Sequence, residues 1–199
     1  MWAGIVLTIL AYLLGSVSFA RVVSRAMKLP DPKTYGSGNP GATNVLRTGN
    51  KKAAALTFLG DFLKGLVAVL IGAAAVTYCP LVWEETLPAM ALSVFLGHLF
   101  PIFHGFKGGK GVATAGGVVI GVAPILGVVV IAVWAIVALG LKISSAGALS
   151  AALALIVGAC VVFGATPMGV ALVLIALISI WRHRANIARL FRGAEDKIQ

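Results

Sequence analysis

The sequence has few charged residues, and this shortage indicates the class of protein. Of its 199 residues, 11% are charged and 60% are hydrophobic, and the mean hydropathy is +1.03. Soluble domains carry about 25% charged residues. A soluble globular protein is therefore excluded, and the length fits one membrane-embedded domain over residues 1–199.

Cysteine and acidic residues are also scarce. The two cysteines, Cys79 and Cys160, are too few for a disulfide framework, and their neighbours are not typical of a metal site. Aspartate and glutamate number 6 against 16 lysines and arginines, which gives a net charge of +10. In a soluble protein this balance would indicate nucleic-acid binding. Here the apolar character of the chain and the placement of its charges favour a membrane and no nucleic acid.

Seven apolar runs, separated by polar breaks, are predicted to be transmembrane helices of an all-α fold. They cover residues 2–23, 53–76, 87–103, 112–122, 125–141, 148–163 and 169–181. A span needs about 20 apolar residues, so the shorter runs imply local thinning of the bilayer or ends covered by protein. We do not expect the first run to be a signal peptide, because it lacks a basic start.

A five-span alternative fuses residues 112–141 and 148–181 into single helices. The second would be about 51 Å long, and Gly164 and Pro167 would interrupt it. Fusion would also place Lys142 on the opposite face from the other basic residues. The seven-span topology is therefore the prediction.

Lysine and arginine gather in alternate breaks, which predicts the orientation of the chain. The residues on this one face are Arg21, Arg25, Lys28, Lys33, Arg47, Lys51, Lys52, Lys107, Lys110, Lys142, Arg182, Arg184, Arg189, Arg192 and Lys197. The breaks on the other face hold Glu84 and Glu85. We therefore expect the N-terminus outside the cell and the basic loops and C-terminus in the cytoplasm.

Two glycine-rich basic loops lie on the predicted cytoplasmic face, "YGSGNPGATNVLRTGN" over residues 35–50 and "FKGGKG" over residues 106–111. Glycines let backbone amides form anion-binding nests, and arginine adds a planar fork suited to phosphate. The second loop lacks the spacing and the following Ser or Thr of a nucleotide phosphate loop. Basic residues alone are also explained by orientation and by contact with anionic lipid headgroups. The combination of both loops indicates a phosphate-bearing ligand.

Other polar residues near these loops are candidates for the same site. Ser144 and Ser145 stand at the start of a predicted helix, where they act either on a ligand or as an N-cap. His183 and Asn186 are three residues apart, so a continuing helix would place both on one face.

Inside the second predicted span, Asp61 and Lys64 are also three residues apart. Ionisable groups at this depth are costly and usually paired. We therefore expect an ion pair that supports the site, with a direct catalytic role for Asp61 as the alternative. Acidic residues are too scarce on the cytoplasmic face to hold magnesium well, so we expect a reaction without a metal or a cofactor.

Four segments together resemble one family, the bacterial acyl-phosphate-dependent glycerol-3-phosphate acyltransferases of the PlsY type. They are "GSGNPGATNVLR" (36–47), "LGDFLKG" (59–65), "GHLFPIFHGFKGGKGVAT" (97–114) and "RHRANIARL" (182–190). The resemblance covers the whole chain, although "KISSAG" (142–147) matches more loosely. It implies a seven-helix, multi-pass enzyme of the bacterial cytoplasmic (inner) membrane, with its active site at the cytoplasmic face.

The resemblance also implies a reaction. A fatty acyl group would pass from acyl phosphate to the 1-hydroxyl of glycerol 3-phosphate, giving lysophosphatidate and phosphate at the entry to phospholipid synthesis. The family uses neither acyl-CoA nor acyl carrier protein. Because acyl phosphate is already an activated anhydride, positioning and charge stabilisation suffice, and no covalent acyl-enzyme is expected.

The matching residues have the following expected roles. Glycerol 3-phosphate would be bound by Ser37, Arg47, Lys110, Ser144 and Ser145. A second set would bind acyl phosphate and orient the hydroxyl and carbonyl groups: Gly38, Asn39, Gly41, Thr43, Asn44, Gly108, Gly109 and Gly111. The catalytic candidates are His183, Asn186 and Lys110, and the supporting pair is Asp61 and Lys64. The proton acceptor is either His183 or the departing phosphate oxygen.

Two other classes of function compete with this hypothesis. Basic loops and an intramembrane Asp61 would suit an anion permease, but the sequence has no visible repeat and no paired broken helices. A structural lipid-binding protein would explain the basic charge but not the glycine pattern.

Overall fold

The computed structural model describes residues 2–198, and the regular elements in that range are all helical. They are α1 (Trp2–Ser16), α2 (Phe19–Ala26), α3 (Ala42–Leu46), α4 (Lys51–Tyr78), α5 (Thr86–Leu99), the 3-10 turn η1 (Ile102–His104), α6 (Val112–Val122), α7 (Pro124–Leu141), α8 (Ser144–Phe163), α9 (Pro167–Arg182) and α10 (Arg184–Phe191). Each of the seven predicted apolar runs overlaps a helix, and the first run covers α1 and part of α2. The all-α prediction is confirmed.

Two prolines separate helices that the five-span alternative would have fused. Pro124 begins α7 and Pro167 begins α9. Proline is favourable at the first position of a helix, because the amide hydrogen that it lacks would have no partner within the helix there. Before α9, Thr166 caps the helix, because its Oγ1 accepts a hydrogen bond from the Gly169 amide at 3.2 Å. The chain therefore turns at both prolines, and the fused helices do not form.

The number of spans is smaller, by length and composition, than the seven we predicted. Within residues 2–198, four helical segments are long and apolar enough to cross a membrane: Lys51–Tyr78, Thr86–His104, Pro124–Leu141 and Ser144–Phe163. The total rises to six if α1 with α2, bent by 44°, and α9 with α10, bent by 55°, each form one broken span. The 11 residues of α6 reach only about 16 Å. The seven-span topology therefore stays a prediction.

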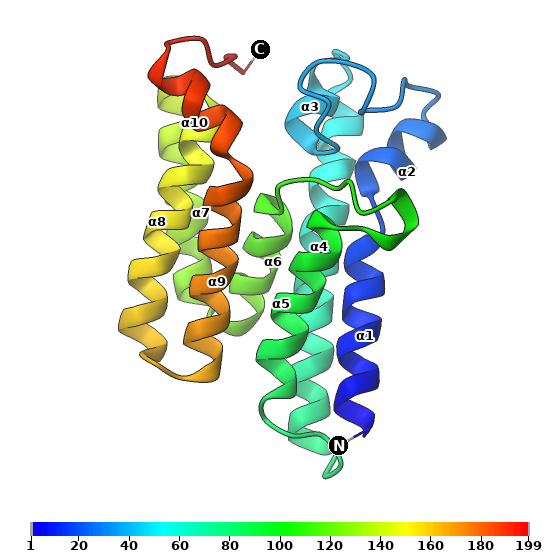
Figure 1. Ribbon diagram of the computed structural model, residues 1–199, viewed down its shortest axis with the longest axis vertical. Coiled ribbons are helices and arrows are strands. Elements are labelled where there is room, and N and C mark those ends of the chain that lie inside the picture. Colours follow the sequence, from blue (N-terminus) through cyan, green and yellow to red (C-terminus); the bar gives the residue numbers. More distant parts are fainter. Residues whose placement is uncertain (1, 199) are drawn as a thin grey trace.

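The helices form two groups with α6 between them, as Figure 1 shows. One group contains α1, α4 and α5, and the other contains α7, α8 and α9. Helix α6 packs against α4 and α7, and α5 also contacts α9. The fully buried side chains of Phe95, Leu99, Leu172 and Ile175 fill the region where α5 meets α9.

Glycines allow the closest helix contacts. A Cβ on Gly97 would stand 2.2 Å from the Tyr12 carbonyl oxygen, and one on Gly117 would stand 2.0 Å from the Phe62 carbonyl oxygen. The backbones of α1 and α5, and of α4 and α6, therefore approach too closely for any larger residue at these positions. Small residues at interfaces are the usual means by which helices pack tightly in lipid.

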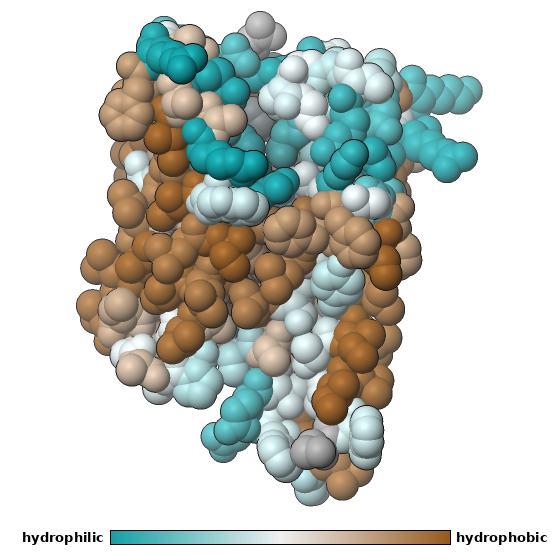
Figure 2. Space-filling model, in the orientation of Figure 1, coloured by the Kyte–Doolittle hydropathy of each residue, from teal (hydrophilic) through white to brown (hydrophobic). Residues whose placement is uncertain are grey.

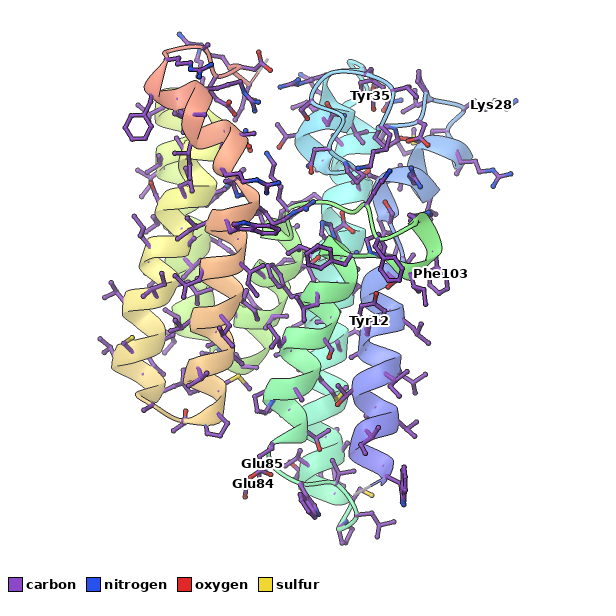
Figure 3. All side chains as sticks on the ribbon, viewed as in Figure 1. Tyr12, Lys28, Tyr35, Glu84, Glu85 and Phe103 are labelled. Carbon is purple, nitrogen blue, oxygen red and sulfur yellow. The ribbon has the colours of Figure 1, made fainter. Side chains whose placement is uncertain are left out.

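The two ends of the molecule differ in polarity. Glu84 and Glu85 lie in the turn between α4 and α5, at the end where the chain begins (Figure 3). Lys28 and Tyr35 lie at the opposite end, with α3, α10 and the C-terminus (Figures 1 and 3). Hydrophilic residues crowd this second end, and hydrophobic residues form a broad band below it (Figure 2). This distribution fits the predicted gathering of basic residues at one end, and the orientation of the chain in the membrane stays a prediction.

Candidate active site

One cavity of about 270 Å³ lies between the two groups of helices. Its polar end is lined by the loop before α3, the residues around Lys110, the start of α8 and the corner between α9 and α10. Its other end runs between apolar side chains. These include Phe58, Phe62, Val119, Val130, Ile131, Trp134, Leu155 and Ile175. The cavity therefore joins a polar end, lined by charged and hydroxyl groups, to an apolar interior.

The loop before α3 is organised around the side-chain amide of Asn44, which is buried. Its Oδ1 accepts hydrogen bonds from the Ser37 amide at 3.0 Å and from Ser37 Oγ at 3.2 Å. Its Nδ2 donates to the carbonyl oxygens of Pro32 and Tyr35 at 2.8 and 3.2 Å. Asn44 lines the cavity, but its amide is used within the loop. We therefore place it as an organiser of the loop rather than as a group that orients substrate.

Gly36 makes this arrangement possible. Its φ is +55°, and a Cβ there would stand 2.4 Å from Asn44 Oδ1 and 2.9 Å from Arg47 Cδ. Because Gly36 has no side chain, the side chains of Asn44 and Arg47 can both pack against this position. Ser37 and Arg47 then line the cavity, as expected from the sequence.

The second glycine-rich loop divides into two parts. The amides of Gly108 and Gly109 donate to the carbonyl oxygens of Leu99 and His98, both at 3.1 Å, and neither glycine lines the cavity. Their amides are therefore not free to bind acyl phosphate as we expected. Gly111 does line the cavity together with the first residues of α6. In the first loop, Gly41 lines the cavity and Gly38 does not.

Lys110 is the cation of the second loop that faces the cavity. Its Nζ donates a hydrogen bond to Asn186 Oδ1 at 2.5 Å. Burial lowers the pKa of Lys110 to about 8, with a smaller opposing effect from Glu195. Near neutral pH the amine still carries its charge, so it can bind a phosphate oxygen.

His183 and Asn186 are brought together by a break in the helix rather than by a continuous one. Helix α9 ends at Arg182 and α10 begins at Arg184. The side chains of His183 and Asn186 both line the cavity. His183 Nδ1 lies 2.8 Å from the Ser179 carbonyl oxygen. Because a carbonyl only accepts, Nδ1 carries the hydrogen, and Nε2 is the acceptor of the neutral ring.

Ser144 and Ser145 reach the cavity from the first turn of α8. The N-cap of this helix is Ile143, so the alternative that either serine caps the helix is wrong. Ser144 Oγ lies 3.1 Å from Thr43 Oγ1, across the cavity mouth.

Two acidic residues at the C-terminus enter the same mouth, and sequence reasoning missed them. Glu195 accepts hydrogen bonds from Ser145 Oγ at 2.7 Å, from Asn186 Nδ2, and from Arg189 Nε at 2.6 Å. Burial works to raise the pKa of Glu195, but these hydrogen bonds lower it below the usual value. Asp196 pairs with Arg47. The signal available in the sequence was the adjacent pair of acids after a basic helix.

Below the polar end, Asp61 and Lys64 form the buried ion pair expected from the sequence, with Nζ 2.9 Å from Oδ1. Lys64 Nζ also donates to the carbonyl oxygens of Gly15 and Val17 at 2.9 and 2.7 Å. His98 Nδ1 lies 3.5 Å from Asp61 Oδ1. This cluster ties the break between α1 and α2 to α4 and α5. Asp61 also lines the main cavity.

A metal-free reaction stays a prediction. Among residues 2–198, no group of three or more His, Cys, Asp and Glu side chains is arranged to hold a metal ion.

Comparisons with known proteins identify the family of this chain. The family model described as glycerol-3-phosphate acyltransferase matches residues 5–193. The glycerol-3-phosphate acyltransferase of Cupriavidus pinatubonensis is 53% identical over 98% of this chain and 96% of its own, and that of Neisseria meningitidis is 50% identical over 94% of each.

Two solved structures share the fold. One is PlsY (YgiH), an integral membrane glycerol 3-phosphate acyltransferase, in its glycerol 3-phosphate form, with a TM-score of 0.90 and 38% identity over 99% of this chain and 96% of that one. Its lysophosphatidic acid form gives a TM-score of 0.87, with 98% and 95% of the two chains covered. The chain therefore belongs to the glycerol-3-phosphate acyltransferase family of the PlsY type.

Proposed function

We propose that this protein transfers a fatty acyl group from acyl phosphate to the 1-hydroxyl of glycerol 3-phosphate, as a multi-pass enzyme of the bacterial cytoplasmic membrane. The observation that supports it best is the cavity of about 270 Å³, which joins charged and hydroxyl groups at one end to an apolar interior at the other. A water-soluble phosphate ester and a lipid chain fit its two ends. The polar end, where the basic loops lie, would face the cytoplasm.

The phosphate of glycerol 3-phosphate would bind to Ser37, Arg47 and Lys110, with Ser144 and Ser145 at the same mouth. An arginine fork and a lysine provide the charge-assisted hydrogen bonds that phosphate oxygens accept. Glu195 contacts Ser145, and Asp196 contacts Arg47. The substrate phosphate would displace these two carboxylates from Ser145 and Arg47.

The acyl phosphate headgroup would lie by Gly111 and the amino end of α6, where backbone amides and the helix dipole favour an anion. Gly41, Asn39 and Thr43 line the facing wall. The acyl chain would extend between Phe62 and Trp134, which line the apolar interior. Gly38, Gly108 and Gly109 would act by shaping their loops.

The reaction needs one bond formed and one broken. The 1-hydroxyl oxygen bonds to the acyl carbonyl carbon, and the bond from that carbon to the phosphate oxygen breaks, so inorganic phosphate leaves with the electron pair. The hydroxyl proton passes to His183 Nε2, or to the departing phosphate oxygen. Lys110 and the Asn186 amide would stabilise the developing negative charge.

A direct assay tests the proposal. Detergent-purified protein is mixed with palmitoyl phosphate and labelled glycerol 3-phosphate, and labelled lysophosphatidate is measured. Palmitoyl-CoA and palmitoyl acyl carrier protein serve as alternative donors. Product from palmitoyl phosphate alone, without vesicles, supports the proposal and excludes obligatory transport. No product from folded protein, or product only from another donor, would overturn it.

A further inference from the structure

We infer that Arg182 is a positioning residue for the transfer reaction. It clamps the glycine-rich loop over residues 106–111 so that Lys110 faces the cavity. The inference rests on the proposed function. Arg182 is the last residue of α9. Its Nη2 donates to the carbonyl oxygens of Gly109 and Gly108 at 2.9 and 3.1 Å, and its Nε donates to that of Gly109 at 3.2 Å.

The other edge of the same loop is held by α5. The Gly108 and Gly109 amides donate to Leu99 and His98, so both edges of this two-residue segment are hydrogen-bonded, one to α5 and the other to α9. A Cβ on Gly108 would stand 2.1 Å from the His98 carbonyl oxygen, and one on Gly109 would stand 2.2 Å from His98 Nε2. The absence of side chains at these two glycines therefore lets the loop pack closely against α5.

Arginine has a shape that lysine does not match at this position. The planar guanidinium presents several N–H donors in a fixed fork, and here two of its nitrogens reach two successive carbonyl oxygens. Its central carbon also lies 5.6 Å from the centroid of the Phe100 ring, a favourable position for a cation. A single ammonium could reach one carbonyl, but would leave the other without a partner.

The clamp links the two parts of the proposed catalytic machinery. Lys110 follows Gly109 directly, and His183 follows Arg182 directly. Lys110 reaches across to Asn186, three residues beyond His183. The Arg182 bonds to Gly108 and Gly109 thus set the separation between the loop and the corner of α9 and α10. Arg182 itself is not among the residues that line the cavity, so it acts through Lys110.

The test compares Arg182→Ala with Arg184→Ala in the full-length protein. Arg184 is exposed, and its guanidinium lies 4.6 Å from the Trp181 ring centroid, away from the loop. We expect kcat/KM for glycerol 3-phosphate to fall about 100-fold in Arg182→Ala, because a displacement of about 1 Å at a reacting group has this cost. Added methylguanidinium should restore part of the activity, and Arg182→Lys should be intermediate. Arg184→Ala should stay within about twofold of wild type.

Two kinetic outcomes would overturn the inference. One is activity of Arg182→Ala within twofold of wild type, and the other is a loss that methylguanidinium leaves unchanged. If Arg182→Ala does not fold, as judged by its melting in detergent, Arg182→Lys with and without methylguanidinium replaces it under the same criteria.

Hydrogen exchange gives a readout that does not depend on activity. Amide exchange in peptides covering residues 105–111 should be faster in Arg182→Ala than in wild type, because the clamped segment opens more often. Arg184→Ala should leave it unchanged. A wild-type protein without acyltransferase activity would refute the proposed function alone, whereas unchanged exchange in Arg182→Ala would refute the clamp.

Discussion

Arg47 Nη2 lies 2.8 Å from Asp196 Oδ2, so the C-terminal segment holds the guanidinium that we propose for the phosphate of glycerol 3-phosphate. Glu195, the preceding residue, contacts Ser145 and Asn186 in the same mouth. Two carboxylates of the chain thus stand among the groups that the substrate phosphate would contact. The Asp196 side chain is 63% exposed, so the ion pair itself adds little to stability.

Replacing Asp196 should therefore help substrate to bind. In Asp196→Asn the competing charge is gone, and we expect the KM for glycerol 3-phosphate to fall about two- to fivefold, which matches an exposed ion pair of up to about 1 kcal/mol. Steady-state kinetics with varied glycerol 3-phosphate measure the change. Asp31→Asn is the matched control, because Asp31 pairs with Arg21 outside the cavity. An unchanged or higher KM in Asp196→Asn would show that Asp196 does not compete.

Titration of Lys110 should make kcat/KM for glycerol 3-phosphate depend on pH. Burial lowers its pKa to about 8, so the free enzyme loses this cation as pH rises through about 8, and kcat/KM for glycerol 3-phosphate should fall there. Lys110→Arg keeps its charge at higher pH, so the fall should move upward even if the overall activity is lower. Profiles of kcat/KM against pH for both proteins check this. A fall at the same pH in the two proteins would assign it to another group.

His183→Ala should separate the two candidate proton acceptors. If Nε2 accepts the hydroxyl proton, turnover should fall about 100-fold or more while the binding of glycerol 3-phosphate is kept. Turnover of the purified variant and binding by calorimetry provide the two measurements. His104→Ala is the control, because His104 lies in η1 outside the main cavity. Near-wild-type turnover in His183→Ala would assign the proton to the departing phosphate oxygen.

Two adjacent glycines of α6 test the close packing on α4. A Cβ on Gly117 would stand 2.0 Å from the Phe62 carbonyl oxygen, whereas one on Gly116 would stand 3.7 Å from the Phe62 ring, an ordinary contact. We expect Gly117→Ala to lower the free energy of unfolding by about 1–3 kcal/mol or more, because a backbone must move. Gly116→Ala should be neutral or slightly stabilising, since alanine favours helix. Thermal unfolding in detergent compares them, and equal melting temperatures would contradict the packing.

Much of the site was predictable because the relevant residues stand in local motifs. Ser37, Arg47 and Lys110 lie in glycine-rich loops, and membrane orientation alone does not explain the composition of these loops. All three residues line one cavity in the structure. The hydrogen-bond partners of those loops were not predictable. Asn44 looked like a ligand group, but its amide is used by neighbouring loop atoms.

The sequence by itself determined the helical character, the apolar runs, the turns at Pro124 and Pro167, and the gathering of basic residues at one end, because each depends on local composition and backbone chemistry. The tertiary structure alone decided which polar groups are free to bind. It showed Gly108 and Gly109 bonded to α5 and clamped by Arg182, and it brought Asp196 to Arg47, 149 positions away. Such contacts depend on how distant helices pack, and a single sequence does not encode this packing in any local pattern.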